Sequence, residues 1–307
     1  MSVNEIRFLG MVAGHPSSGN GGPDRHADRR LRAGVPLIVG TVLVALLAGL
    51  SGCRGGEPAH PSGGVAAATP GVRNPDMPIP DVTTPGAPTP TGPTGPYAAR
   101  VPRFADAPIP KPVTVPAGAE AGWYSRIPTT QPVAFLTIDD GWIKNPEFRQ
   151  LLLDAHVPVT LFLTVNAIKD DPDYFRRFPA NVVIEAHTIT HQGLRGKSYA
   201  TQRREICGSA DQLAQWYGRR PVLFRPPGGN KDATTLRATR DCGMKAAFFW
   251  KETVDKGKVR YQEGRRVRAG DIILMHFRER FVDDFIAALT AIHAAGLTPA
   301  LLGDYVR

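Results

Sequence analysis

Two short stretches far apart in the chain combine carboxylate and imidazole side chains at a spacing that suits metal-assisted hydrolysis. The first, TIDDG at Thr137–Gly141, sets Asp139 and Asp140 at the end of an apolar run. The second, HTITH at His187–His191, sets two imidazoles four residues apart behind another apolar run. Two histidines and one carboxylate are the usual protein ligands of a catalytic zinc-type ion that keeps one position open. A second carboxylate is then free to act as a base.

The elements that must position these residues alternate between strand-like and helix-like patterns. The expected strands are Val133–Ile138, Val159–Val165, Val182–His187, Val222–Arg225, Lys245–Trp250, Ile272–Met275 and Pro299–Leu302. The expected helices are Pro146–His156, Asp171–Phe178, Tyr199–Tyr217, Lys231–Cys242 and Phe281–Ala295. This order predicts an α/β fold with a parallel sheet of about seven strands, either open or closed like a barrel. Ligands of such sheets bind at the carboxyl ends of the strands, where both stretches fall.

Two further polar clusters follow later strands: RPPGG at Arg225–Gly229, and His276 directly after Ile272–Met275. With these four clusters in this order, residues 130–305 resemble the polysaccharide deacetylase family, carbohydrate esterase family 4. The resemblance implies a distorted (β/α) barrel. It also implies removal of N- or O-acetyl groups from polymers such as chitin, peptidoglycan or xylan.

The same resemblance implies a role for each site residue. Asp140, His187 and His191 would bind the metal, and Asp139 would act as the base. Arg225 would hold the base carboxylate, and His276 would be the catalytic acid. Gly228 would supply a backbone N–H to the oxyanion, and Trp250 would stand at a strand end beside the substrate. His156 and His293 lie in helical stretches and are interpreted as structural.

The chain departs from the family pattern at several positions. Ile138 and Gly228 stand where the family more often has aromatic residues. The family supports its catalytic histidine with a Trp and Asp pair, and Trp250 fits only the first of these. Glu252 or Asp255 would have to orient His276 instead.

The N-terminal segment, residues 1–52, has the features of a lipoprotein signal peptide. Arginines precede the apolar run Val35–Leu50, and Leu50–Cys53 reads LSGC, which resembles a lipobox. Cys53 is therefore the expected lipidation site, and the protein is expected to be anchored outside the cytoplasmic membrane. An uncleaved anchor helix and ordinary secretion are the alternatives, and all three export the rest of the chain.

Residues 53–117 are rich in Pro, Gly and Thr and poor in large apolar side chains. Such a segment cannot bury enough surface to offset its ordering entropy. We interpret it as a disordered tether that lets an anchored enzyme reach nearby wall polymer, although an inert spacer is also compatible. Residues 118–307 are long enough for one domain with its own core.

Cys207 and Cys242 remain besides Cys53. In an exported protein they are expected to pair, and two buried free thiols are the alternative. The chain has a formal net charge of +9, but its basic residues are not interleaved with aromatic ones. We therefore expect no nucleic-acid partner. The charge suits anionic wall polymers or lipid head groups, or is simply a solvated surface.

The leading hypothesis is an exported, lipid-anchored, metal-dependent deacetylase that acts as a monomer on N-acetylated sugars of the cell envelope. Zinc is the default metal, with cobalt, nickel or manganese as alternatives. A second hypothesis is a carbohydrate-binding lipoprotein that has lost turnover. A third is a metal-dependent amidase or esterase acting on small acetylated substrates.

Overall fold

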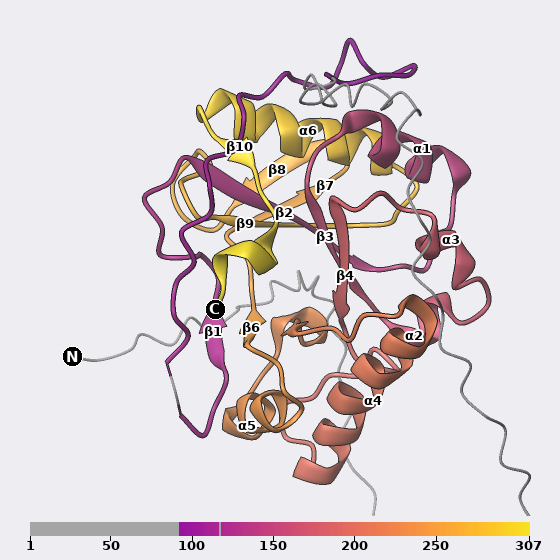
Figure 1. Ribbon diagram of the computed structural model, residues 1–307, viewed down its shortest axis with the longest axis vertical. Helices are drawn as coiled ribbons and strands as arrows, with labels where there is room; N and C mark the ends of the chain where they lie inside the picture. Colours follow the sequence, from indigo (N-terminus) through magenta and orange to yellow (C-terminus); the bar gives the residue numbers. More distant parts are fainter. Residues whose placement is uncertain (1–91, 117) are drawn as a thin grey trace, which may run out of the picture. The chain divides into compact units, whose positions relative to one another are not determined.

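The computed structural model describes residues 92–116 and 118–307 (Figure 1). The expected signal peptide, Cys53 and residues 54–91 of the expected tether lie outside the described residues. Within the described ranges, no helix has the length and apolar character needed to cross a membrane.

The described residues form ten strands, six α-helices and two short 3-10 helices. The strands are β1 (Gly122–Tyr124), β2 (Val133–Asp140), β3 (Val159–Leu163), β4 (Val182–Ala186), β5 (Leu223–Phe224), β6 (Ala246–Phe248), β7 (Glu252–Asp255), β8 (Lys258–Tyr261), β9 (Ile272–His276) and β10 (Thr298–Pro299). The helices are α1 (Pro146–Ala155), α2 (Val165–Ile168), α3 (Asp173–Arg176), α4 (Tyr199–Tyr217), α5 (Ala233–Asp241) and α6 (Phe281–Ala294), with 3-10 turns at Pro227–Gly229 and Leu302–Tyr305.

The strands form one curled sheet in the order β1-β6-β5-β4-β3-β2-β9-β7-β8, and β10 pairs with the start of β2. The neighbouring strands run parallel except in the β7–β8 hairpin, which is antiparallel. Helices α1, α4 and α6 lie along the outside of this half-barrel (Figure 1). The expected α/β class and distorted barrel of parallel strands are thereby confirmed.

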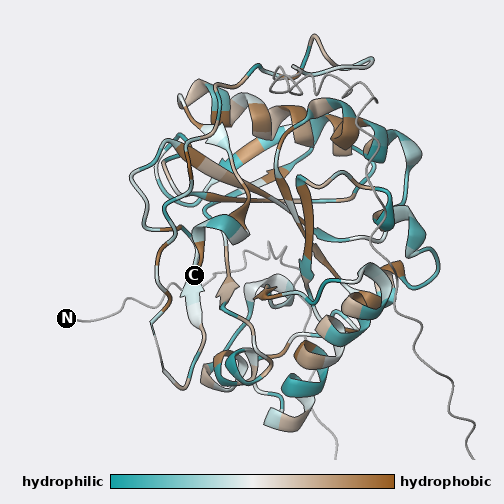
Figure 2. Cartoon of the chain, viewed as in Figure 1, coloured by the Kyte–Doolittle hydropathy of each residue, from teal (hydrophilic) through white to brown (hydrophobic). Residues whose placement is uncertain are grey.

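Alternation along the strands separates two apolar clusters. In β2, Leu136 and Ile138 pack in the larger cluster with the helices, whereas Phe135 lies in the smaller cluster inside the curl. Successive side chains of a strand point to opposite faces, so Asp139 continues the inner face. Figure 2 shows the matching pattern, with apolar central strands and helices that are apolar on one side only. The inner face therefore changes from apolar to charged at the carboxyl end of β2.

The observed element boundaries agree best with the expected ones where the sequence contains capping residues. Helix α4 spans Tyr199–Tyr217 as expected, because Ser198 caps its start and Gly218 ends it in a left-handed conformation. Strands β1, β7 and β8 were not expected. Each has only three or four residues, and β8 alternates exposed and half-buried positions at the edge of the sheet, which leaves little apolar pattern to detect.

We expected residues 53–117 to form a disordered tether, but residues 92–116 pack on the domain. Val101 and Val115 are buried, and Val113 donates a backbone hydrogen bond to Tyr305 at 3.0 Å. Tyr97 also hydrogen-bonds the Glu147 carboxylate through its hydroxyl. The boundary that we placed at Gly118 is therefore too late for this segment, since a few apolar side chains suffice to attach a Pro-rich segment to the domain.

Cys207 of α4 and Cys242, which follows α5, form a disulfide with their Cα atoms 5.0 Å apart. This is the pairing expected from the sequence. It links the two helices that cover the strands behind HTITH and RPPGG.

Candidate active site

Four strands deliver charged side chains to one point at the carboxyl ends of the sheet. Asp139 is in β2, His187 follows β4, Arg225 follows β5 and His276 ends β9. All four continue the inner face of the curl. For example, Leu223 lies in the inner cluster, and Arg225 two residues later points the same way. The structure thus brings together the four clusters that the sequence placed at separate strand ends.

Asp140, His187 and His191 each offer one ligand atom, and these three atoms lie within 4.8 Å of one another. Nε2 of His191 is 3.0 Å from Oδ1 of Asp140, and Nε2 of His187 is 3.4 Å from the same oxygen. This Oδ1 is buried and accepts no hydrogen bond. A buried carboxylate oxygen facing two imidazole nitrogens without a hydrogen bond is the donor arrangement that surrounds a shared cation. The residues therefore fit a divalent metal ion.

The surroundings of His187 fix which ring nitrogen is free. Its Nδ1 lies 2.7 Å from the backbone carbonyl oxygen of Arg225, so this nitrogen carries the hydrogen and donates it. Nε2 then keeps its lone pair and faces Asp140. Fixing the far nitrogen in this way is how metal-binding histidines are commonly oriented.

Asp140 is held ready as an anion. Burial raises the pKa of its carboxyl group, but the neighbouring imidazoles of His187 and His191 outweigh burial and hold that pKa well below its usual range. The backbone at Asp140 is left-handed, with φ of 79°. Such a conformation is uncommon outside glycine and asparagine, and it turns the carboxylate out of the strand towards the histidines.

Asp139, the expected base, has a different neighbour. Nη1 of Arg225 donates to Oδ1 of Asp139 at 2.6 Å and to the hydroxyl oxygen of Thr137 at 2.8 Å. The other oxygen, Oδ2, lies 3.7 Å from Nε2 of His187. One carboxylate oxygen is therefore held by the arginine, while the other faces the metal ligands.

Arg225 is fully buried, and aromatic rings surround its guanidinium group. The ring centroid of Phe162 is 4.4 Å from Cζ and that of Trp250 is 5.8 Å away. Nη2 also donates to the Phe249 carbonyl at 3.2 Å. Burial lowers the pKa of Arg225 and the nearby Asp139 carboxylate opposes that shift. The stacked rings and the ion pair compensate for the buried charge.

His276 is the register partner of Asp139 in the neighbouring strand. Burial lowers the pKa of its imidazole, and the carboxylates of Asp139 and Asp140 act in the opposite direction. His276 thus stands beside the expected base, on the side of the site opposite β3.

The structure corrects our expectation for Glu252 and Asp255, because the partners of both carboxylates are residues other than His276. Glu252 is buried beside Asp271, whose carboxylate also bonds Arg126. Asp255 pairs with Arg278 at 3.2 Å and Arg260 at 3.4 Å. In the described part of the chain, no carboxylate takes the orienting role. The short β7 and its hairpin, which the sequence pattern did not reveal, direct these two side chains elsewhere.

RPPGG forms a tight turn whose glycines Gly228 and Gly229 have φ of 63° and 67°. A Cβ atom on Gly229 would lie 2.1 Å from Cε2 of Phe249. Glycine is therefore required for the Phe249 ring to pack there and stack on Trp250, with ring centroids 4.0 Å apart. The Trp250 ring lies beside the guanidinium group of Arg225. Its contact with substrate, and the oxyanion role of the Gly228 N–H, stay predictions.

The sequence analysis missed Glu205, which holds the HTITH loop from α4. Its Oε2 accepts the backbone N–H groups of Ile189 at 3.0 Å and Thr190 at 2.9 Å. Its Oε1 accepts from the side chain of Gln192 at 2.8 Å. Glu205 is buried, and a glutamate on the buried face of a helix was the available signal. It positions His191 through the loop.

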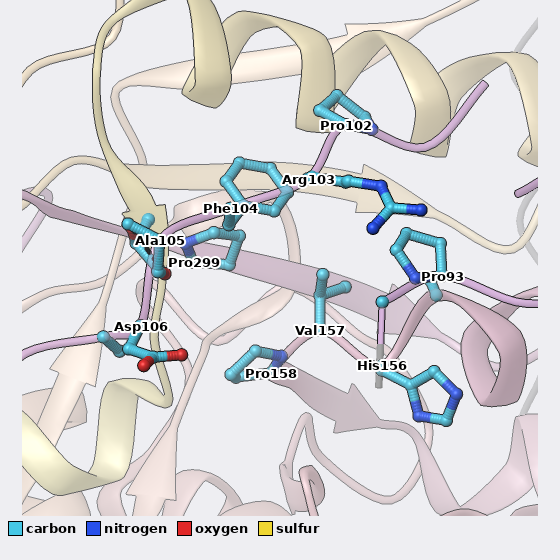
Figure 3. A pocket seen from close by; sticks show the side chains of 14 residues that line it. Pro93, Pro102, Arg103, Phe104, Ala105, Asp106, His156, Val157, Pro158 and Pro299 are labelled. Atoms are coloured by element: carbon cyan, nitrogen blue, oxygen red, sulfur yellow. Dashed lines mark hydrogen bonds between the residues drawn. The ribbon is translucent and has the colours of Figure 1, made fainter. Parts of the chain in front are cut away.

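A cavity of about 430 Å³ lies away from these residues. Figure 3 shows it between Arg103 and Phe104 of the N-terminal segment and the loop His156–Pro158, beside Pro299. The loop precedes β3, so the cavity lies at the opposite strand ends from the metal ligands. His156 lines this cavity and His293 packs edge-on against Phe104, with centroids 5.8 Å apart. Both histidines lie outside the site, as expected.

TIDDG, HTITH and RPPGG all lie within residues 126–247, which match the family model for polysaccharide deacetylase. Residues 126–247 belong to the polysaccharide deacetylase family. His276 lies beyond the matched stretch, so its assignment depends on the geometry described above.

Two relatives match the deacetylase domain in sequence. An uncharacterized protein of Streptomyces coelicolor is 43% identical over 151 residues, which are 48% of this chain and 61% of that protein. The match thus spans less than two thirds of that relative's length. A peptidoglycan-N-acetylglucosamine deacetylase of Bacillus cereus is 21% identical over 178 residues, which are 54% of this chain and 83% of that protein.

Solved structures share the fold. A CE4 family pseudoenzyme from Bacillus anthracis superposes with a TM-score of 0.54 at 18% sequence identity, covering 61% of this chain and 70% of that one. At this identity the similarity establishes the fold of the deacetylase domain.

Proposed function

We propose that this chain is a metal-dependent hydrolase that removes acetyl groups, most simply N-acetyl groups of amino sugars, from a cell-envelope or extracellular polysaccharide. The observation that carries the proposal is the pair of neighbouring carboxylates with separate partners. Asp140 faces His187 and His191, whereas Asp139 is bonded to Arg225. This arrangement supports a division of roles, in which Asp140 holds a cation and Asp139 takes a proton.

The chain's own groups can complete an amide hydrolysis. A divalent ion held by Asp140, His187 and His191 would supply Lewis-acid polarisation of the acetyl carbonyl and of a water molecule. Asp139, fixed by Arg225, accepts the proton that the attacking water releases. His276, on the neighbouring strand, gives a proton to the leaving nitrogen as the C–N bond breaks. Water and the acetamido group thereby become acetate and a free amine.

Zinc is the metal we propose, because two imidazoles and one carboxylate with an open position match its catalytic sites. An amino-sugar polymer is the proposed substrate because the Bacillus cereus relative carries the name of a peptidoglycan-N-acetylglucosamine deacetylase.

We also propose that the protein is exported and anchored through Cys53. The support is the arginine-preceded apolar run Val35–Leu50 and the LSGC sequence that follows it. The Cys207–Cys242 disulfide is consistent with an oxidising compartment. Growth of an expressing bacterium with labelled palmitate tests this proposal. The wild type is expected to take up label and to sediment with membranes, and Cys53→Ala is expected to do neither. Equal labelling of both would contradict it.

One observation favours a second function, that of a binding protein without turnover. Within the described residues His276 lacks the carboxylate partner that we expected from Glu252 or Asp255. Acetate release separates the two functions. The mature chain, taken to begin at Cys53, is loaded with zinc and incubated with N-acetylglucosamine oligomers, peptidoglycan and acetylated xylan. We expect acetate from at least one amino-sugar polymer. Tight binding of such a polymer without acetate would instead support the binding protein.

A further inference from the structure

Trp142 follows the TIDDG motif directly, two residues beyond the metal ligand Asp140. Its side chain is 53% exposed. Only Trp142 and Ile109 are exposed large apolar side chains in residues 92–116 and 118–307. The indole ring of Trp142 therefore offers a large apolar face that a ligand at the neighbouring site can cover.

The backbone before Trp142 forces it out of the sheet. Asp140 and Gly141 both have positive φ, of 79° and 99°. A Cβ atom on Gly141 would lie 2.5 Å from a methyl carbon of Ile168, so glycine is needed for this turn to press against α2. The chain therefore turns sharply at the end of β2, and the exposed Trp142 follows this turn directly.

The loop that holds Trp142 is clamped at its far end. Nζ of Lys144 donates to the Ala167 carbonyl at 2.9 Å and pairs with Asp170 at 2.9 Å. The hydroxyl of Tyr174 donates to the Asn145 carbonyl at 2.6 Å. An exposed ring on a loop fixed at both ends loses little entropy when a ligand covers it. This is the property of a preorganised binding surface.

Two tryptophans thus accompany the site residues. Trp142 follows Asp140 by two residues, and the Trp250 ring centroid lies 5.8 Å from Cζ of Arg225, the residue that bonds Asp139. Trp250 already stacks on Phe249, whereas in the described part of the chain no aromatic ring stacks on Trp142. The apolar C–H face of a pyranose ring is a natural partner for a free indole face. A polymer places a second sugar there, and a small acetylated molecule does not.

We propose that Trp142 is a sugar-binding residue that stacks on the pyranose next to the acetylated one, so that this neighbouring sugar contributes to substrate binding. This inference rests on the proposed deacetylase function. It assigns substrate specificity to a residue outside the metal ligands, base and acid.

The test compares Trp142→Ala, Trp142→Phe and the control Ile109→Ala in the zinc-loaded mature chain. Ile109 is a suitable control because it is 88% exposed and lies far from the site. Its carbonyl oxygen accepts a hydrogen bond from the side chain of Gln131, which precedes the start of β2, whereas Trp142 follows the end of β2. Acetate release from the N-acetylglucosamine pentamer and hydrolysis of 4-nitrophenyl acetate are measured. Trp142→Ala is expected to raise KM for the pentamer about tenfold, with kcat reduced less than about threefold. The ratio of the pentamer kcat/KM to the nitrophenyl ester kcat/KM is therefore expected to fall about 10- to 30-fold. Trp142→Phe is expected to recover most of the loss, and Ile109→Ala to behave like the wild type.

A pentamer KM in Trp142→Ala equal to that of the wild type would overturn the proposal, as would an equal loss on both substrates. A wild type that releases no acetate would instead contradict the proposed function. Calorimetry still tests the stacking in that case, with Asp139→Asn alone and combined with Trp142→Ala. The double variant is expected to bind the pentamer about tenfold more weakly. Equal affinities, or no binding by either variant, would overturn the proposal.

Discussion

The backbone carbonyl oxygen of Arg225 accepts a hydrogen bond from Nδ1 of His187 at 2.7 Å. The guanidinium group of the same arginine donates to Asp139 at 2.6 Å. Arg225 therefore orients the candidate metal ligand His187 through its main chain and the proposed base Asp139 through its side chain. A side-chain substitution changes only the second contact, so the two roles can be measured separately.

Arg225→Lys is expected to lower kcat/KM for acetate release about 100-fold. An ammonium group keeps the charge but cannot reproduce the planar fork that reaches Asp139, Thr137 and Phe249 together. Zinc affinity is expected to change less than about threefold, because the contact to His187 comes from the backbone.

Arg220→Lys is the matched control, since Arg220 pairs with the exposed Asp211 at the surface. It should leave both quantities close to wild type. Loss of zinc from Arg225→Lys, or full activity in that variant, would contradict the separation of roles.

Glu205→Ala is expected to weaken zinc binding about 10- to 100-fold without removing a ligand. The substitution releases the N–H groups of Ile189 and Thr190, which lie in the loop that ends at His191. Competition with a metallochromic chelator measures the dissociation constant. Asp211→Ala changes an exposed carboxylate on the same helix and should bind zinc normally. An unchanged zinc affinity in Glu205→Ala would show that the loop holds its shape alone.

Glu252→Gln is expected to make the protein less sensitive to alkaline pH. Burial, followed by the charge of Asp271, raises the pKa of Glu252 from 4.5 to about 9, although Arg126 and Lys251 oppose the shift. Between these values the folded state keeps a proton that the unfolded chain releases. The free energy of unfolding therefore falls as the pH rises from about 4.5 towards 9. The glutamine variant lacks this titration.

Melting temperatures at pH 6 and pH 9 measure the effect. The drop between them should be smaller in Glu252→Gln than in the wild type by at least about 3 °C. Glu263→Gln is the control, because Glu263 is exposed and paired with Lys251. Equal drops in the wild type and Glu252→Gln would show that Glu252 releases its proton in the folded state at lower pH.

The disulfide is expected to stabilise the fold by about 2–4 kcal/mol, because it closes a loop of 35 residues. Urea unfolding with and without reductant measures this free energy for the wild type. The double variant Cys207→Ser, Cys242→Ser should match the reduced wild type and should not respond to reductant. A wild type that is equally stable in both forms would contradict this expectation.

The sequence predicted which polar side chains gather at one end of the sheet, because each lies next to a strong strand pattern. Asp139, His187, Arg225 and His276 each follow a short apolar run, and parallel strands bring such ends together. The sequence also predicts which side chains of β2 share a face with Asp139, because every second residue of a strand points to the same side of the sheet.

The contacts within the site could not be predicted in the same way. Glu205 lies on a helix beyond the HTITH loop, and its position in the sequence does not indicate which backbone N–H groups donate to its carboxylate. Glu252 was linked to His276 because it follows Trp250, where the resembled family has its Trp and Asp pair, but the β7–β8 hairpin turns it towards Asp271. The attachment of residues 92–116 depends on single apolar side chains such as Val101, which a composition average hides.

Acetate release from the N-acetylglucosamine pentamer by the mature chain tests the central claim most directly. The measurement is made on the wild type, Asp139→Asn and His187→Ala, first stripped with a chelator and then supplied with zinc, with bound metal counted in each sample. The wild type should lose release on stripping and regain it with zinc. Asp139→Asn should bind zinc yet release less than about one hundredth as much acetate, and His187→Ala should lose both. Release that survives chelation, or full turnover by zinc-loaded Asp139→Asn, would contradict the account.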